Sequence, residues 1–197
     1  MKVAALYHDI GKMLKPMYFI ENQPIAPDGK PTFNPHNNLS HDDSAKVIIE
    51  HVTEGARMAE RHNLPRIIID FIWTHHGTTF VEYFYRLHLR THEASEEDKK
   101  IFQYPGPTPR TKEETILMLA DSLEAASKSL RNPDAQAIDD LVDKIVQGKI
   151  DQKQLHHSAL SFQDLELCKR SFKQTLKNIH HLRIEYPSDA RQKRDTS

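Results

Sequence analysis

The sequence predicts an all-α fold, a bundle of helices without a sheet. Apolar residues recur at intervals of three and four along most of the chain, which is the period of one face of an α-helix. Capping residues stand where several of these stretches begin. No stretch shows the alternation of apolar and polar residues that is typical of a half-buried strand. The 197 residues are enough for one domain with its own core.

Seven stretches are predicted to be helical, and loops separate them. The stretches are residues 2–10, 41–62, 66–76, 80–102, 113–130, 134–147 and 161–184. The longest loop, residues 13–40, holds five of the 11 prolines, and ordered loops of this length are often functional. A second loop, residues 104–109, is predicted to be a rigid turn because it alternates proline with small residues.

The residues that flank these stretches explain where each helix starts and stops. Gly11 suits the left-handed position that ends a helix, and Gly77 is placed to close the stretch 66–76. Thr111 with Glu114 is the signature of a capping box. Serine or threonine stands at the start of three of the stretches, or just before it, as a predicted N-cap: Ser40, Thr111 and Ser161.

The composition excludes several classes of protein. A formal net charge of −1 gives no sign of a general nucleic-acid surface, so no nucleic-acid polymer is expected as partner. The single cysteine, Cys168, excludes an intramolecular disulfide framework and fits a reducing compartment. No apolar run approaches the roughly 20 residues of a membrane helix, and no signal peptide is visible. We therefore expect a soluble, cytoplasmic chain.

Six histidine and aspartate side chains stand beside apolar residues and are the candidate site. They are His8, Asp9, His51, His75, His76 and Asp121. Unpaired polar groups are costly in apolar surroundings, whereas imidazole and carboxylate groups bind divalent transition metals. A shared buried metal cluster would account for all six. Six ligands exceed what one catalytic metal usually needs, and a carboxylate can bridge, so two ions are expected.

Two ions held about 3.5–4 Å apart lower the pKa of a bound water and stabilise both oxygens of a phosphoryl displacement. His75 and His76 can reach one ion together only near a helix end, because neighbouring helix residues diverge by about 100°. Gly77 supports such an end. Lys12 lies one short turn beyond Asp9, where its ammonium can meet a phosphate oxygen.

The chain has 13 histidines, so adjacent pairs also arise by chance. His156-His157 and His180-His181 lie in polar, lysine-rich stretches, and we assign them to solvated faces. The other histidines are interpreted as loop or surface residues: His36, His41, His62, His88 and His92.

Taken together, the motifs resemble the HD superfamily of metal-dependent phosphohydrolases. The ordered set is YHDIGKMLKPMYFIEN at 7–22, NPH at 34–36, IIEHVTEG at 48–55, HHGTT at 75–79, YPGP at 104–107 and TILMLADSLEAA at 115–126. This set looks like the cytoplasmic HD domain of seven-transmembrane-HD receptors, the PgpH-type phosphodiesterases that hydrolyse cyclic di-AMP. The resemblance covers about residues 2–185.

The resemblance implies an HD-domain helical bundle over residues 1–185 and a polar tail over 186–197. It implies two divalent ions, iron or manganese, and a linear dinucleotide product. The ligands it implies are His8, Asp9 and Asp121 for one ion, with Asp9 bridging to a second ion on His51, His75 and His76. Lys12 would contact the scissile phosphate, which makes Asp9 and Lys12 the expected catalytic residues.

The family pattern has another metal-binding histidine on a helix that precedes the His-Asp pair, and this chain begins too late to contain it. We therefore expect an N-terminally truncated fragment whose first ion lacks a ligand. The parent protein is expected to be membrane-anchored and a potential homodimer. Two alternatives stay open: a non-catalytic nucleotide-binding or sensor HD module, and an HD nucleotidase acting on nucleoside phosphates.

Overall fold

The computed structural model describes residues 1–24, 26, 32–93, 95–130 and 132–181. Within these residues the chain forms α-helices and short 3-10 helices, and the one β contact is an isolated antiparallel bridge between Phe80 and Gln103. The prediction of an all-α fold is confirmed. The predicted domain end at 185 and the polar tail 186–197 lie outside the described residues.

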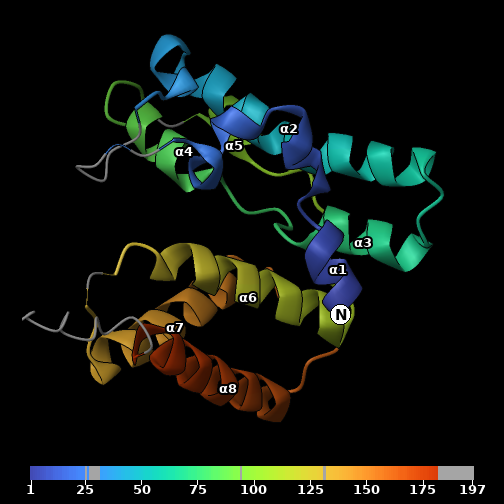
Figure 1. Ribbon diagram of the computed structural model, residues 1–197, viewed down its shortest axis with the longest axis vertical. Coiled ribbons are helices and arrows are strands. Elements are labelled where there is room, and N and C mark those ends of the chain that lie inside the picture. Colours follow the sequence, from blue (N-terminus) through green and yellow to red (C-terminus); the bar gives the residue numbers. More distant parts are fainter. Residues whose placement is uncertain (25, 27–31, 94, 131, 182–197) are drawn as a thin grey trace, which may run out of the picture.

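The helices fall into two groups that face each other. In chain order the elements are α1 (Lys2–Tyr7), η1 (Ile10–Leu14), η2 (Pro16–Tyr18), η3 (Ile20–Asn22), η4 (Pro35–Asn38), α2 (His41–Arg61), α3 (Arg66–Thr74), α4 (Glu82–His88), α5 (Glu96–Phe102), α6 (Lys112–Ser127), α7 (Ala135–Asp151) and α8 (Phe162–His181). One group holds α2 to α5, the other holds α6 to α8, and α1 lies beside α3 near the second group (Figure 1).

Three apolar clusters form the core, and the first of them joins the two groups of helices. Small residues on α2, among them Ala56 and Ala59, let α3 pack closely through Phe71 and Ile72, and Leu117 of α6 completes this cluster. A second cluster joins α6, α7 and α8. The third cluster lies within the first group of helices and joins α2, α4 and α5. The contact through Leu117 fixes α6 against α2 and α3, which is where the candidate ligands come from.

Several predicted helix ends are confirmed by their capping contacts. The Ser40 hydroxyl accepts a hydrogen bond from the Asp43 N–H at the start of α2. Thr111 and Glu114 form the predicted capping box at the start of α6. Gly77 adopts a φ of +55°, in the left-handed region, in the turn that follows α3, although α3 itself already ends at Thr74.

Some predicted helix boundaries are wrong. The helix predicted to end at 130 ends at Ser127, and the one predicted to end at 147 continues to Asp151. Two further errors change the packing. Residues 80–102 do not form one helix: α4 ends at His88, and a capping box between Ser95 and Asp98 starts α5. Gly11 does not end the first helix in a left-handed conformation, because α1 already ends at Tyr7 and Gly11 lies inside η1. Gly11 is instead packed on α2, where an added Cβ would overlap the backbone oxygen of His51.

None of the helices in the described part of the chain combines the length and the hydropathy that a membrane crossing requires.

Candidate metal centre

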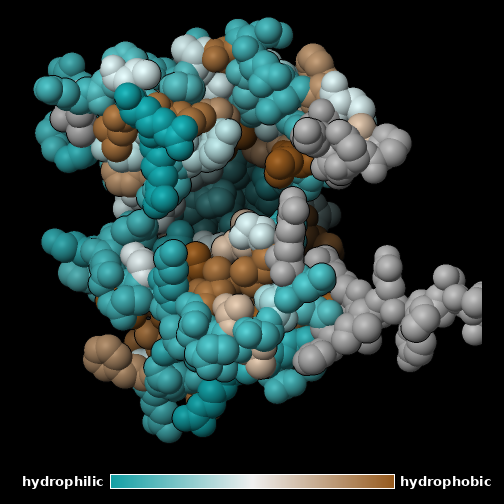
Figure 2. Space-filling model, turned by 90° about the vertical axis from the view of Figure 1, so that its left-hand side faces the viewer, coloured by the Kyte–Doolittle hydropathy of each residue, from teal (hydrophilic) through white to brown (hydrophobic). Residues whose placement is uncertain are grey.

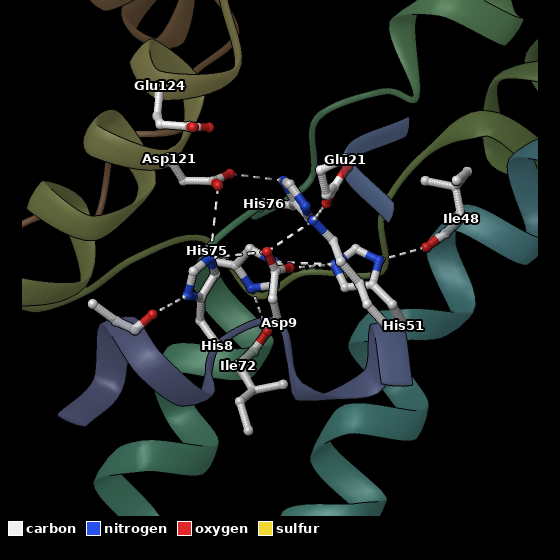
Figure 3. A network of polar contacts seen from close by, with 12 residues as sticks. His8, Asp9, Glu21, Ile48, His51, Ile72, His75, His76, Asp121 and Glu124 are labelled. Atoms are coloured by element: carbon white, nitrogen blue, oxygen red, sulfur yellow. Dashed lines mark hydrogen bonds and ion pairs between the residues drawn. The ribbon is translucent and has the colours of Figure 1, made fainter. Parts of the chain in front are cut away.

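All six predicted ligands converge between the two groups of helices (Figure 3). The link between α1 and η1 supplies His8 and Asp9, α2 supplies His51, the end of α3 supplies His75 and His76, and α6 supplies Asp121. They form two sets of donor atoms, each within 4.8 Å of one another: Asp9, His51, His75 and His76, and His8, Asp9 and Asp121. Asp9 belongs to both sets.

The two carboxylate oxygens of Asp9 face different neighbours. Asp9 Oδ1 lies 3.4 Å from His51 Nε2 and 3.6 Å from His75 Nε2. Asp9 Oδ2 lies 3.3 Å from His8 Nε2. Asp121 completes the second set, with its Oδ1 3.6 Å from His8 Nε2. Asp9 therefore has the position of a bridging carboxylate, with one oxygen toward each set.

Three of the imidazole rings are held in the same way. The Nδ1 atoms of His8, His51 and His75 lie 2.9, 2.5 and 2.8 Å from backbone carbonyl oxygens. The acceptors belong to the residue three positions earlier in each helix: Ala5, Ile48 and Ile72. A carbonyl can only accept, so Nδ1 carries the proton and Nε2 presents its lone pair to the cluster. Metal-ligating histidines are commonly oriented by such a hydrogen bond.

The donor set fits a divalent transition metal. The Nε2 atoms of His51 and His75 are only 3.2 Å apart, although neither carries a proton to share when both Nδ1 atoms donate to carbonyls. His8 Nε2 and Asp9 Oδ1 are buried without a hydrogen-bond partner in the described residues. Buried lone pairs that face one another are costly unless a cation lies between them. Imidazole with carboxylate is a ligand set that iron, manganese and zinc accept.

The electrostatics of the two sets differ. Burial lowers the pKa of His8, but its contacts with Asp121 and Asp9 outweigh burial and raise the pKa to about 10. The same two carboxylates would attract a metal cation in place of that proton. Burial lowers the pKa of His75 and, together with the neighbouring histidines, lowers that of His76 well below 6.5. Both rings are therefore neutral at pH 7, as a metal ligand must be.

Lys12 lies at the edge of the cluster and forms an ion pair with Asp9. Its Nζ lies 2.8 Å from Asp9 Oδ2 and 2.6 Å from Glu21 Oε1, and it stands 5.2 Å from the centre of the Phe19 ring. Sequence reasoning missed Glu21, although it lies in the same motif as Lys12. Glu21 and Asp9 together hold the ammonium at the edge of the cluster.

Tyr104 is a second neighbour that sequence reasoning did not place at the site. Its ring stacks on His76 with the centroids 4.2 Å apart and the planes 22° apart. Burial, reinforced by the charges of Asp121 and Asp9, raises the pKa of the Tyr104 phenol far above its usual value, so the phenol stays protonated. The YPGP motif that contains Tyr104 was the available signal.

His88 does not lie on the surface, as the sequence interpretation had it. It is buried, with Nδ1 3.2 Å from Asp42 Oδ1 and Nε2 3.5 Å from Asp98 Oδ1. The error follows from the single helix predicted over 80–102, because the break after α4 lets α5 pack back over His88. Among the remaining histidines, His36 is half-buried against Phe84, whereas His156 and His157 are exposed as expected.

The fold and the cluster of histidines and aspartates define the class of protein. The chain matches the HD domain family over residues 1–126, and it belongs to this family. HD domains are metal-dependent phosphohydrolases, so a dependence on divalent metal follows from the family and agrees with the donor sets described above.

Within the family, the chain is most informatively compared with PgpH. It is 40% identical over 94% of its length to the cyclic-di-AMP phosphodiesterase PgpH of Bacillus subtilis (strain 168), and 35% identical over 95% to the PgpH of Listeria monocytogenes serotype 1/2a (strain 10403S). It spans about a quarter of the length of each of these relatives, 25%.

A solved structure extends the comparison to three dimensions. The crystal structure of the L. monocytogenes PgpH HD domain in complex with cyclic di-AMP superposes with a TM-score of 0.83 at 35% identity, covering 93% of this chain and 81% of that one. The predicted resemblance to the HD domain of PgpH-type phosphodiesterases is confirmed.

Proposed function

We propose that this chain is a metal-dependent phosphodiesterase that hydrolyses cyclic di-AMP to the linear dinucleotide. The observation that carries the proposal is the position of Asp9, whose two oxygens face two separate sets of ligands. The relatives named as cyclic-di-AMP phosphodiesterases and the solved domain in complex with cyclic di-AMP support the choice of substrate.

The proposed site binds two divalent ions, iron or manganese. The first is assigned to His8, Asp9 and Asp121, and the second to Asp9, His51, His75 and His76. When bound, such a pair supplies an activated water and stabilises the attacking and leaving oxygens of a phosphoryl displacement. In this mechanism the chain's own residues hold the ions, and Lys12 offsets negative charge on the scissile phosphate.

The substrate is proposed to enter through a hollow between the two groups of helices. The hollow opens on the face at the left of Figure 1, and apolar and polar residues both line its rim (Figure 2). The metal ligands come from the same two groups, α2 and α3 on one side and α6 on the other.

The surroundings of the domain are also part of the proposal. We propose that the HD domain extends to about residue 185, with a tail beyond it, and that the domain works on the cytoplasmic face of a membrane-anchored receptor, with a homodimer as the assembly to test. The membrane-anchored arrangement is what the resemblance of the motifs to seven-transmembrane-HD receptors implies.

The direct test couples metal analysis to hydrolysis. The chain loaded with Mn²⁺ or Fe²⁺ is expected to convert cyclic di-AMP to the linear dinucleotide, to lose activity after chelation, and to regain it when metal returns. Binding of cyclic di-AMP without any product would favour the sensor module instead. Faster hydrolysis of nucleoside monophosphates than of cyclic di-AMP would favour the nucleotidase.

The variant Lys12→Ala is expected to lower kcat for cyclic di-AMP by roughly 10²-fold, the scale of removing one preorganised charge-stabilising group. Metal content should stay nearly unchanged, because a protonated lysine is not a ligand. Turnover assays beside metal analysis of the same samples check both. Lys15→Ala is the matched control, since Lys15 lies in the same segment but pairs with Glu50 at 2.7 Å. Equal loss of metal and activity in Lys12→Ala would show that Lys12 supports Asp9 rather than the phosphate.

A further inference from the structure

The turn of residues 75–79, which carries the two adjacent histidine ligands, is held by contacts from distant parts of the chain. Gln103 Nε2 donates a hydrogen bond of 2.8 Å to the Thr78 carbonyl. A second contact comes from Gln154, just beyond α7 and only 2% exposed. Gln154 lies outside residues 1–126, the segment that matches the HD domain family.

The Gln154 amide has a defined orientation. Its Oε1 accepts a hydrogen bond of 2.9 Å from the Thr78 N–H. Its Nε2 donates to the Gln152 carbonyl at 2.9 Å and to the Thr78 hydroxyl at 3.0 Å. A backbone N–H can only donate and a carbonyl can only accept, so the two ends of the amide are not interchangeable. Position 154 therefore requires a side chain of the length of glutamine that carries both a hydrogen-bond acceptor and a donor.

The end of α7 fixes where Gln154 stands. Lys153 has a φ of +58°, which places a non-glycine residue in the left-handed region. The Gln154 N–H donates to the Lys149 carbonyl and the Lys153 N–H to the Ile150 carbonyl, both at 2.9 Å. This is the Schellman arrangement of a helix end. It turns the chain out of α7 and presents Gln154 to the turn after α3.

The two segments approach too closely for any side chain between them. Gly77 lies against Gln154, and an added Cβ at Gly77 would overlap Gln154 Oε1 and lie 2.8 Å from Met118 Cε. Gly77 also needs its positive φ of +55° to make the turn. The backbone of Gly77 and Thr78 therefore lies directly against the Gln154 amide.

Of the four candidate histidine ligands, His76 depends most on the backbone of this turn for its orientation. The other three histidines have Nδ1 fixed by a backbone carbonyl, but in the described part of the chain no carbonyl holds a ring nitrogen of His76. Its ring stacks on Tyr104, and its Nδ1 stays 3.9 Å from Asp121 Oδ2. The direction in which His76 points is therefore set by the backbone of the turn together with the Tyr104 ring.

We infer that Gln154 is a positioning residue for His76: by holding the Thr78 backbone it sets the direction of a metal ligand from the helical hairpin α7–α8. This inference rests on the proposed function, since it takes His76 to be a ligand. The hairpin then does more than cover the HD core, because it supplies one of the supports of the metal site.

The test uses Gln154→Met, which keeps the length and volume of the side chain but removes all three of the amide's hydrogen bonds: one from the Thr78 N–H, one to the Thr78 hydroxyl and one to the Gln152 carbonyl. We expect Mn²⁺ affinity, measured by calorimetric titration, to fall by about 10–100-fold, the usual effect of losing an orienting group. The absorption spectrum of the Co²⁺-loaded variant should shift in the direction of His76→Ala. Activity on cyclic di-AMP should recover when excess Mn²⁺ is added.

Controls separate positioning from folding. Gln154→Asn keeps the amide but is one methylene shorter, so it should weaken Mn²⁺ binding in the same direction even if the methionine variant folds poorly. Gln147→Ala, at an exposed position of α7, should bind Mn²⁺ like the wild type. Wild-type Mn²⁺ affinity and Co²⁺ spectra in the folded Gln154 variants, beside weakened binding in His76→Ala, would overturn this inference alone. Wild-type binding in His76→Ala would overturn the proposed function and the inference together.

Discussion

Asp9→Ala is expected to abolish hydrolysis of cyclic di-AMP and to remove most of the bound metal. Asp9 is shared by both sets of ligands, and no other acid in the described residues reaches both. Loss of an orienting neighbour costs about 10–100-fold, so loss of a shared ligand should lower kcat by more than about 10²-fold. The fold should persist, because Asp9 belongs to none of the apolar clusters. Metal analysis, turnover and circular dichroism of one preparation check all three expectations.

Two further variants sharpen this test. Asp9→Asn keeps the shape of the side chain and one carbonyl oxygen, but it lacks the charge and second acceptor that bridging needs, so it should also be inactive. Asp70→Ala removes an acid from the surface of α3, where Asp70 pairs with Arg66, and should retain activity. Turnover near the wild-type rate in Asp9→Asn would refute the bridging role, whatever Asp9→Ala does.

The sequence predicted most of the helices and singled out the six candidate ligands because both depend on local patterns. Ser40 and Thr111 mark helix starts through residues only three positions away. The six ligands stand out because histidine and aspartate are unusual beside apolar residues, and the ordered motifs then imply how they group. Their convergence was an inference from chemistry, and the structure places them together.

The parts that the sequence did not predict depend on contacts between distant segments. Gln154 looks like any polar residue after a helix, and only its approach to Gly77 gives it a role. His88 lies in a charged stretch, yet α5 covers it once the helix breaks. Gly11 has the local pattern of a helix end, but its backbone is needed for contact with α2. The roles of Gln154, His88 and Gly11 therefore cannot be predicted from the residues next to them in the sequence.

Gly11→Ala is expected to destabilise the fold and the metal site together. The backbone of η1 rests on α2, so a Cβ at Gly11 would overlap the His51 oxygen and lie 2.7 Å from the His51 carbonyl carbon and 2.8 Å from the Gly55 nitrogen. These are backbone atoms, and no rotation of a side chain can relieve them. Forced overpacking of this kind typically costs about 1–3 kcal/mol, a large share of the roughly 5–15 kcal/mol that stabilises a domain.

The same overlap should also displace the candidate ligands, because η1 follows Asp9 directly and α2 carries His51. If the two elements move apart, the gap of 3.4 Å between Asp9 Oδ1 and His51 Nε2 widens, and Mn²⁺ affinity should fall with the melting temperature. Gly148→Ala is the control: nothing lies within 4 Å of an added Cβ there, and alanine favours the helix by about 1 kcal/mol. A melting temperature for Gly11→Ala equal to that of Gly148→Ala would mean that η1 and α2 are not in contact as described, since only the close approach distinguishes the two glycines.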